Sequence, residues 1–344
     1  MNRKKNRLIF MIIIYTLTFL TVSGCRTEGR YTEPEKIRFF ALDTLATITV
    51  YSSDNGSDVI EILESCKKLC DDYENLFSRT REGSDIYRIN HANGNTTAVS
   101  DDTFYLISES LRYSESSGGL FDITIAPVMD LWGFGDSDIN TLPDEKKLSE
   151  ALSHVSYKNI ILDENTCSVT LRDPEAMLDL GALAKGYIAD RIREHMTESG
   201  ITSAVIDLGG NILTIGKKPD GSAFNIGIKA PFPENDPLYP GKNPFENGIA
   251  DSVKVYDKSV VTSGIYERYK QIGEGFYHHI IDPFTGYPAE NTLASVTIIT
   301  DTSLKGDLLS TTCLLLGREE AIKLIESASV QAVLIEKNGR ITRK

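Results

Sequence analysis

The chain has 344 residues, a formal net charge of −13 and five cysteines. This length suits one large domain or two smaller ones with a sizeable core. The hydrophobic share of 41% and the charged share of 25% are typical of a globular protein, and they exclude a disordered chain or one with many membrane spans. The acidic balance argues against a nucleic-acid-binding protein, which needs a basic surface. The cysteine spacing fits neither a zinc site nor a disulfide scaffold.

Residues 1–24 have the pattern of a signal peptide. Four basic residues precede the uncharged stretch Leu8–Val22, whose 15 residues are fewer than the roughly 20 that cross a bilayer. The sequence Val22-Ser23-Gly24-Cys25 then resembles the lipobox of bacterial lipoproteins. We predict cleavage before Cys25, lipidation of its sulfur and a tether over 25–36, with two acyl chains for stable anchoring. The working domain, 37–344, then lies on the extracytoplasmic side of the cell membrane. The alternative is an uncleaved N-terminal anchor.

The remaining chain mixes helices and strands. Periodicity predicts, in chain order, a strand region at 37–51 with a break at 43–44, a helix at 57–77, helices at 101–117 and 143–153, a hairpin at 160–171, a helix at 181–199, strands at 204–215, 224–229, 252–262 and 295–300, helices at 303–316 and 318–327, and a hairpin at 333–343. Cys66 and Cys70 fall on the apolar stripe of the first helix, which favours core packing over redox chemistry. The absence of a regular βαβ pattern favours an α+β fold with mixed or antiparallel sheets and flanking helices, in one large, two-lobed domain.

Several familiar catalytic motifs are missing from the sequence. The glycines at 210–217 are spaced one residue too far apart for a phosphate-binding Walker A loop, and GxGxxG, GxSxG and HExxH do not occur. Segments rich in glycine, aspartate and histidine remain: 118–124, 179–187, 207–211, 262–268, 278–283, and Asp307 with Thr311. Each alone has an ordinary structural explanation, such as a turn, a solvated helix face or a surface histidine. At 181–186, two glycines and a lysine near a helix start favour phosphate.

Taken in order, these segments resemble the FAD:protein FMN transferase (ApbE) family, over roughly residues 37 to 335. The stretches DLGALAKGY, SGIYERY and HHIIDPFTGYP carry the resemblance. It implies that a Thr or Ser hydroxyl of an acceptor flavoprotein attacks the riboflavin-side phosphorus of FAD, that AMP leaves, and that FMN stays on the acceptor. By the same resemblance, the acceptors are exported or membrane flavoproteins.

The resemblance also implies a divalent ion, usually Mg²⁺. Its ligands would be Asp307, Thr311 and the backbone carbonyl of Ala182. The i,i+4 spacing places the Asp307 carboxylate and the Thr311 hydroxyl side by side on one helix face, and hard oxygen ligands suit Mg²⁺. The alternative is a capped, solvated helix face without a metal.

FAD-binding residues are carried over from the family in the same way. They are Leu42, Thr80, Leu120, Phe121, Asp122, Asp179, Lys185 and Ile281. Two positions depart from the family pattern: Asp43 stands where a glycine is common, and Thr80 stands where relatives carry a larger aromatic or amide side chain. An apolar slot would hold the isoalloxazine ring.

His279 is the predicted proton acceptor for the incoming hydroxyl, since the pKa of an unperturbed histidine lies near neutrality. His278 is expected on the opposite face of the same strand. A purely structural role for His279, as a hydrogen-bond partner of a phosphate, is the alternative. Two other functions share these residues in whole or in part: metal-dependent hydrolysis of FAD to FMN and AMP, and non-catalytic flavin binding. A metal site on the phosphates argues against the last of these.

Overall fold

The computed structural model describes residues 33–54, 56–134, 141–231 and 248–344. Contacts divide the chain into two units, Met1–Pro34 and Glu35–Lys344. The signal peptide and the lipidated Cys25 predicted above therefore lie outside the described residues. Within the described part of the chain, no helix has the length and apolar character needed to cross a membrane.

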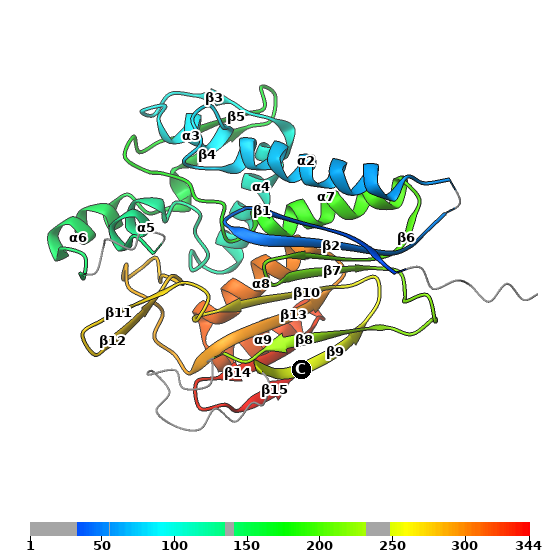
Figure 1. Ribbon diagram of the computed structural model, residues 1–344. Helices are drawn as coiled ribbons and strands as arrows, with labels where there is room; N and C mark the ends of the chain where they lie inside the picture. Colours follow the sequence, from blue (N-terminus) through cyan, green and yellow to red (C-terminus); the bar gives the residue numbers. More distant parts are fainter. Residues whose placement is uncertain (1–32, 55, 135–140, 232–247) are drawn as a thin grey trace, which may run out of the picture. The chain divides into compact units, whose positions relative to one another are not determined.

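The centre of the second unit is an eight-stranded antiparallel sheet. Its order is β1-β2-β6-β7-β10-β13-β14-β15. These strands are β1 Glu35–Ala41, β2 Thr44–Ser53, β6 Ile201–Leu208, β7 Asn211–Ile215, β10 Ser259–Gly264, β13 Leu293–Thr300, β14 Gln331–Glu336 and β15 Ile341–Arg343. Strands that are distant in sequence, such as β2 and β6, are neighbours in the sheet, so the sheet gathers segments from the whole chain (Figure 1).

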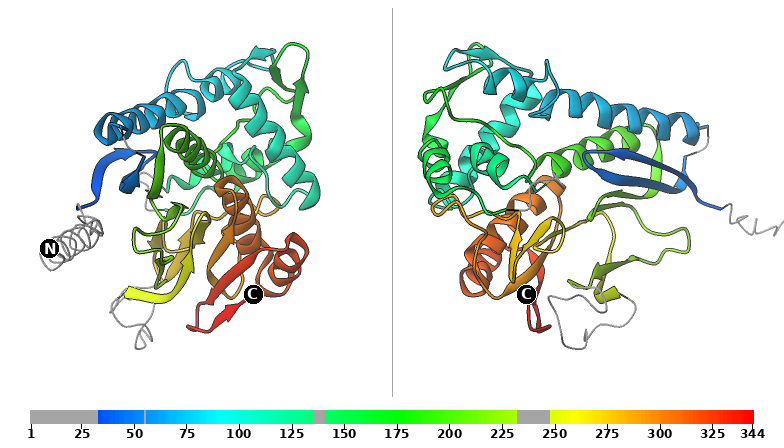
Figure 2. Two further views of the ribbon diagram at one scale, coloured as in Figure 1. Left: turned by 90° about the vertical axis from the view of Figure 1, so that its right-hand side faces the viewer. Right: turned by 60° about the vertical axis from the view of Figure 1, so that its left-hand side comes forward.

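Four helices contact this sheet and cover one of its faces: α2 Val59–Phe77, α7 Ala184–Glu198, α8 Ser303–Leu316 and α9 Arg318–Ala328. The described residues also form α3 Asp85–Asn90, α4 Asp101–Ser116, α5 Ala126–Trp132 and α6 Glu145–Ser153. Figure 2 shows α2 and α7 side by side along the first strands, and α8 packs against α7, β10 and β13. The largest apolar cluster lies beneath α2 and α7 and includes Ile48 and Ile188, both fully buried.

A small hairpin covers part of the opposite face. Its strands β8 Phe224–Lys229 and β9 Ile249–Val255 pack Phe224 and Ile226 against the central sheet. Alternation along β13 explains how both faces are filled: Ile298 belongs to the cluster under α8 and α9, whereas Ile299 belongs to the cluster under this hairpin. Smaller sheets are formed by β3 Thr97–Ala98, β5 Ser168–Leu171 and β4 Ile160–Asp163, and by β11 Tyr269–Ile272 with β12 Gly275–His278.

The predicted α+β class with antiparallel sheets and flanking helices is confirmed. Cys66 and Cys70 are fully buried, as the apolar stripe of α2 predicts. Two predicted strands were each too long: 204–215 belongs to β6 and β7, which are joined at Gly209-Gly210, and 252–262 belongs to β9 and β10. Both glycines have positive φ, which the tight connection requires. The short elements α3 and α5 and the β11–β12 hairpin were not predicted.

Candidate active site

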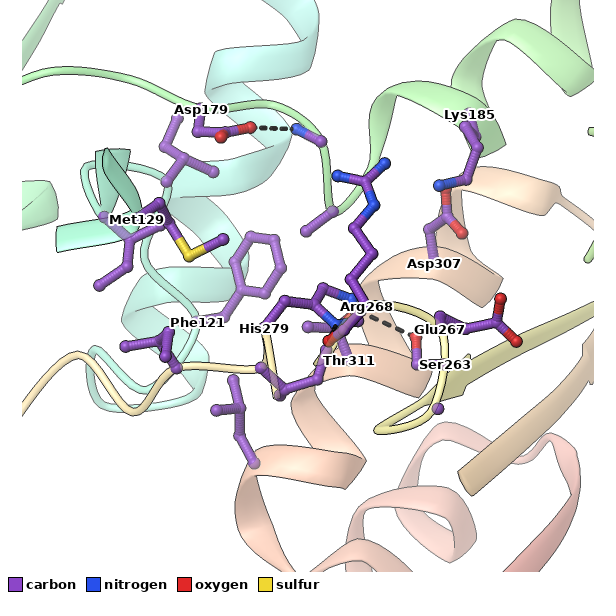
Figure 3. Close-up of a pocket in the computed structure, with 18 of the residues that line it drawn as sticks. Phe121, Met129, Asp179, Lys185, Ser263, Glu267, Arg268, His279, Asp307 and Thr311 are labelled. Carbon is purple, nitrogen blue, oxygen red and sulfur yellow. Dashed lines mark hydrogen bonds between the residues drawn. The ribbon is translucent and has the colours of Figure 1, made fainter. Parts of the chain in front are cut away.

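One cavity of about 370 Å³ gathers residues from segments that lie far apart in the sequence. Its walls come from the β1–β2 turn, residues 120–129 up to the first turn of α5, residues 179–185 up to the start of α7, the β6–β7 turn, the end of β10 with the loop that follows, the segment after β12, and α8. Its lining combines apolar, acidic and basic side chains (Figure 3).

Nearly all the residues predicted for the site line this cavity. They are Leu42, Leu120, Phe121, Asp122, Asp179, Ala182, Lys185, His279, Ile281, Asp307 and Thr311. Thr80 is the exception among the described residues: its hydroxyl pairs with the Ser78 hydroxyl at 3.2 Å, and it is not part of the cavity lining. The structure does not support a Thr80 contact in this cavity. Its neighbour Arg79 reaches the site instead, because the Arg79 Nε lies 3.1 Å from the Asp179 carboxylate.

Asp307 is fixed at the polar end of the cavity by donors from two other elements. Its Oδ2 accepts from the Gly186 backbone N–H at 2.6 Å, and its Oδ1 accepts from Asn211 Nδ2 at 3.0 Å. Thr311, one turn later on α8, has its hydroxyl 3.1 Å from the Ser263 hydroxyl. The i,i+4 pair therefore faces the cavity as expected, and both side chains present hard oxygen atoms to it.

Close packing of α7 on α8 makes this arrangement possible. A Cβ atom at position 186 would lie 2.5 Å from the Ser303 carbonyl oxygen and 2.8 Å from the Asp307 carboxylate, so only glycine fits. The predicted helix start at Gly181 is corrected, since α7 begins at Ala184. Residues 181–183 form a turn in which the Gly181 N–H donates to the Asp179 side chain at 2.7 Å.

Burial raises the pKa of the Asp307 carboxyl to about 6, although the nearby Lys185 ammonium and the two donated hydrogen bonds oppose the shift. A divalent cation would favour the ionised carboxylate. Among the described residues, no group of three or more His, Cys, Asp or Glu side chains has metal-binding geometry. A metal site made of one carboxylate, one hydroxyl and one main-chain carbonyl contains a single side chain of these four types, so it does not form such a group.

The other end of the cavity is mainly apolar. Phe121 and Ile281 are buried there, and Met129, which packs against the cluster of Ile281, completes the slot. Asp122 also lines the cavity, and its carboxylate accepts from the Thr124 backbone and hydroxyl and from the Tyr157 N–H at 2.7 Å. Burial raises the pKa of Asp122. An aromatic ring with a polar edge fits such a slot.

The two adjacent histidines line different cavities, but β12 ends at His278, so His279 follows the strand and does not lie on it as predicted. His279 lies in the site, whereas His278 lines a second hollow behind the β11–β12 hairpin, where its Nε2 donates to the Ala289 carbonyl at 3.2 Å. The expected ordinary pKa of His279 is wrong: burial and the nearby Arg268 charge lower it to about 3. His279 is therefore neutral at physiological pH. Its Nδ1 donates to the Arg268 carbonyl at 3.0 Å, which leaves Nε2 as an acceptor.

Sequence reasoning missed several residues of the site. Arg268 and Glu267 belong to the quoted SGIYERY stretch, and Asn211 ends the segment 207–211, but no role was assigned to them. Their presence in those stretches was the available signal. Met129 had no signal, because its helix α5 was not predicted.

Comparisons with known proteins agree with this geometry. A model of the ApbE family matches residues 42–334. The FAD:protein FMN transferase of Klebsiella pneumoniae is 37% identical over 271 residues, 78% of this chain and 80% of that protein. The Treponema pallidum FAD:protein FMN transferase is 33% identical over 335 residues, 93% of this chain and 89% of that protein.

Solved structures show the same fold. The ApbE protein of Thermotoga maritima matches with a TM-score of 0.82 at 29% identity, over 91% of this chain and 97% of that chain. The apo flavinyl transferase ApbE of Pseudomonas stutzeri matches with a TM-score of 0.77 at 26% identity, over 91% of this chain and 94% of that chain. The family predicted from the sequence motifs is confirmed by these matches.

Proposed function

Because this chain belongs to the ApbE family, we propose that it transfers FMN from FAD to a Thr or Ser hydroxyl of an acceptor protein. The relatives named above carry the same activity in their names. In the proposed reaction, the hydroxyl oxygen bonds to the riboflavin-side phosphorus, the P–O bond to the second phosphate breaks, and AMP leaves. The acceptor keeps FMN through a phosphoester bond.

The observation that carries this proposal is that the cavity containing His279 has one apolar end and one polar end. An apolar slot at Phe121 and Ile281 and a polar end at Lys185, Asp307 and Thr311 lie in a single cavity. A flavin ring matches the first end and a diphosphate matches the second. With the flavin ring at the apolar end and the diphosphate at the polar end, the riboflavin-side phosphorus would lie near His279. The unprotonated Nε2 of this residue would then accept the proton of the hydroxyl.

The oxygen donors of the polar end fit Mg²⁺. The Asp307 carboxylate and the Thr311 hydroxyl would hold the ion together with the Ala182 carbonyl, and a bound Mg²⁺ supplies positive charge that offsets the charge developing on the phosphates. Asn211 and the Gly186 N–H keep the Asp307 carboxylate oriented. Lys185 adds a fixed positive charge near the same carboxylate (Figure 3).

Membrane attachment through lipidated Cys25 is part of the proposal and rests on the sequence pattern at 22–25. Acceptors would then be flavoproteins that present a hydroxyl on the extracytoplasmic side of the membrane.

A single assay tests the proposal. Purified protein is incubated with FAD, magnesium chloride and a candidate acceptor, and the gel is inspected for flavin fluorescence while AMP and free FMN are measured. Transfer gives a fluorescent acceptor band and AMP. Free FMN with AMP, and no fluorescent band with any acceptor, would instead identify an FAD hydrolase. Bound but intact FAD would contradict both reactions.

A further inference from the structure

The proposed function assigns no role to one cationic side chain of the cavity, that of Arg268. Arg268 lines the cavity and extends into it, towards the segment that carries Asp179 and Lys185 (Figure 3). Among the described residues, no carboxylate forms an ion pair with its guanidinium, although five acidic side chains line the same cavity.

Those acidic groups are mostly engaged elsewhere. Four of the five have other donors or cations: Asp122 accepts from Thr124 and Tyr157, Asp179 from Arg79 and Gly181, and Asp307 from Gly186 and Asn211, while Glu267 lies 3.7 Å from the Lys229 ammonium. Asp43 stands exposed on the β1–β2 turn. The guanidinium of Arg268 therefore remains available for an anion that enters the cavity.

Hydrogen bonds fix the main chain at Arg268. Its carbonyl accepts from both the backbone N–H and the Nδ1 of His279, each at 3.0 Å. Because Tyr269 pairs with His278 in the β11–β12 hairpin, Arg268 and His279 continue that register as neighbours across the hairpin. The positive charges of Arg268 and Lys185 both act on the neutral His279 ring, so these two cations form one electropositive cluster beside it.

An anionic ligand needs such a cluster here. A diphosphate that enters a cavity with five carboxylates meets repulsion unless cations offset it. Lys185 is directed towards Asp307, so its charge is partly offset by that carboxylate. A guanidinium presents a planar fork of N–H donors that matches two phosphate oxygens, which makes Arg268 the suitable partner.

We propose that Arg268 binds the diphosphate of FAD and is the main side-chain determinant of affinity for the phosphate part of the substrate. The identity of the ligand rests on the proposed function, whereas the preference for a diphosphate rests on the unpaired guanidinium. Arg268 thereby places the diphosphate beside His279, to which its own carbonyl is hydrogen bonded.

The test measures binding and not transfer. Dissociation constants of FAD, ADP and riboflavin are determined by isothermal titration calorimetry, with magnesium chloride in every sample, for the wild type, Arg268→Gln and Arg268→Lys. Arg172→Gln is the matched control, since Arg172 is exposed and lies outside the cavity lining. Thermal unfolding verifies that each variant is folded.

We expect Arg268→Gln to weaken FAD and ADP by about 10- to 100-fold, as for a lost charge-assisted hydrogen bond, and to leave riboflavin binding unchanged. The affinity of Arg268→Lys for FAD and ADP should lie between those of the wild type and Arg268→Gln, because an ammonium group is a point charge and lacks the planar fork of donors of a guanidinium. An equal loss for riboflavin, or no loss for FAD and ADP, would overturn the proposal. Selective loss of FAD and ADP supports it even if the wild type transfers no FMN, a result that would contradict only the proposed function.

Discussion

Asp307 is a buried residue, and burial disfavours the charged form of its carboxyl group. It is 6% exposed, and burial raises its pKa to about 6 from an unfolded value near 3.9. Between these two values the folded protein holds a proton that the unfolded chain has lost, so metal-free stability falls as pH rises through this window. The loss is complete above about pH 6 and is on the order of 3 kcal/mol.

The first prediction follows from this effect of burial. In chelated buffer, wild-type stability should fall relative to that of Asp307→Ala as pH rises from about 4 to 7, and magnesium chloride at pH 7 should raise the Tm of the wild type only. Denaturant unfolding at several pH values measures the first effect, and thermal unfolding with and without magnesium chloride measures the second. The same variant should abolish FMN transfer, with a smaller effect for Thr311→Val, since a neutral hydroxyl is a weaker ligand. A pH-independent stability difference would contradict the raised pKa, and full activity of Asp307→Ala in chelated buffer would contradict the metal site.

His279 provides the second prediction. His279→Ala should keep near-normal FAD affinity while the transfer rate falls by the ~10²–10⁴-fold typical of a lost general base. Because its pKa is about 3, the imidazole of the free protein is already unprotonated at pH 5, so this residue should add no pH dependence to kcat/KM between pH 5 and 8. The rate should fall only as pH approaches 3.

Rate and affinity measured on one preparation separate the two roles of this histidine. His91→Ala is the matched control, because His91 is exposed and lies outside both cavities. If FAD affinity falls in proportion to rate in His279→Ala, the residue is a ligand contact and not a base. A rate limb near pH 7 that disappears in the variant would contradict the lowered pKa.

At the scale of elements, the site depends on the contact between α7 and α8. The hydrogen bonds run both ways: the Gly186 N–H of α7 donates to Asp307, and the Asp190 carboxylate of α7 accepts from the Ser303 and Leu304 N–H groups at 2.9 and 3.0 Å. The second pair of bonds satisfies the first N–H groups of α8, which have no partner within the helix. The contact therefore sets both the start of α8 and the position of its carboxylate.

The third prediction tests this contact with one methyl group. Gly186→Ala should lower the free energy of unfolding by about 1–3 kcal/mol, because the new Cβ meets the backbone oxygen of Ser303 and cannot be accommodated by a side-chain rotation. It should also remove the magnesium-dependent rise in Tm, since Asp307 loses its position. Gly227→Ala is the control: the nearest atom to a Cβ there is 3.5 Å away, in the Ile249 side chain. Equal Tm values for both variants would disprove the close contact.

At the scale of the whole molecule, the fourth prediction concerns the anchor. Cys25→Ser should release or misprocess the protein in cells, because the acylated sulfur is lost, and the isolated domain 37–344 should keep its transfer activity. Membrane fractionation and the mass of the mature N-terminus measure the effect. Cys167→Ser, at a half-buried position outside the cavity, is the matched control. Unchanged fractionation and processing of Cys25→Ser would contradict lipidation.

Local chemistry explains what could be read from the sequence alone. The apolar stripe of α2, the Asn338-Gly339 hairpin and the break near residue 43 are set by side-chain periodicity and turn preference, which act over a few residues. The stretches DLGALAKGY, SGIYERY and HHIIDPFTGYP identified the family, and all the described site residues predicted from it, except Thr80, line one cavity.

Only the tertiary structure decided the remaining properties. Gly186 and Asp307 are 121 positions apart, and Asn211 and Asp307 are 96 apart, so no local pattern shows that they meet. The pKa of His279 depends on burial and on charges that Arg268 and Lys185 bring from other elements. The guanidinium of Arg268 has no carboxylate partner among the described residues, because most carboxylates of the cavity bind other donors or cations. Desolvation and pairing are properties of groups brought together by packing, and a sequence specifies them only through the complete fold.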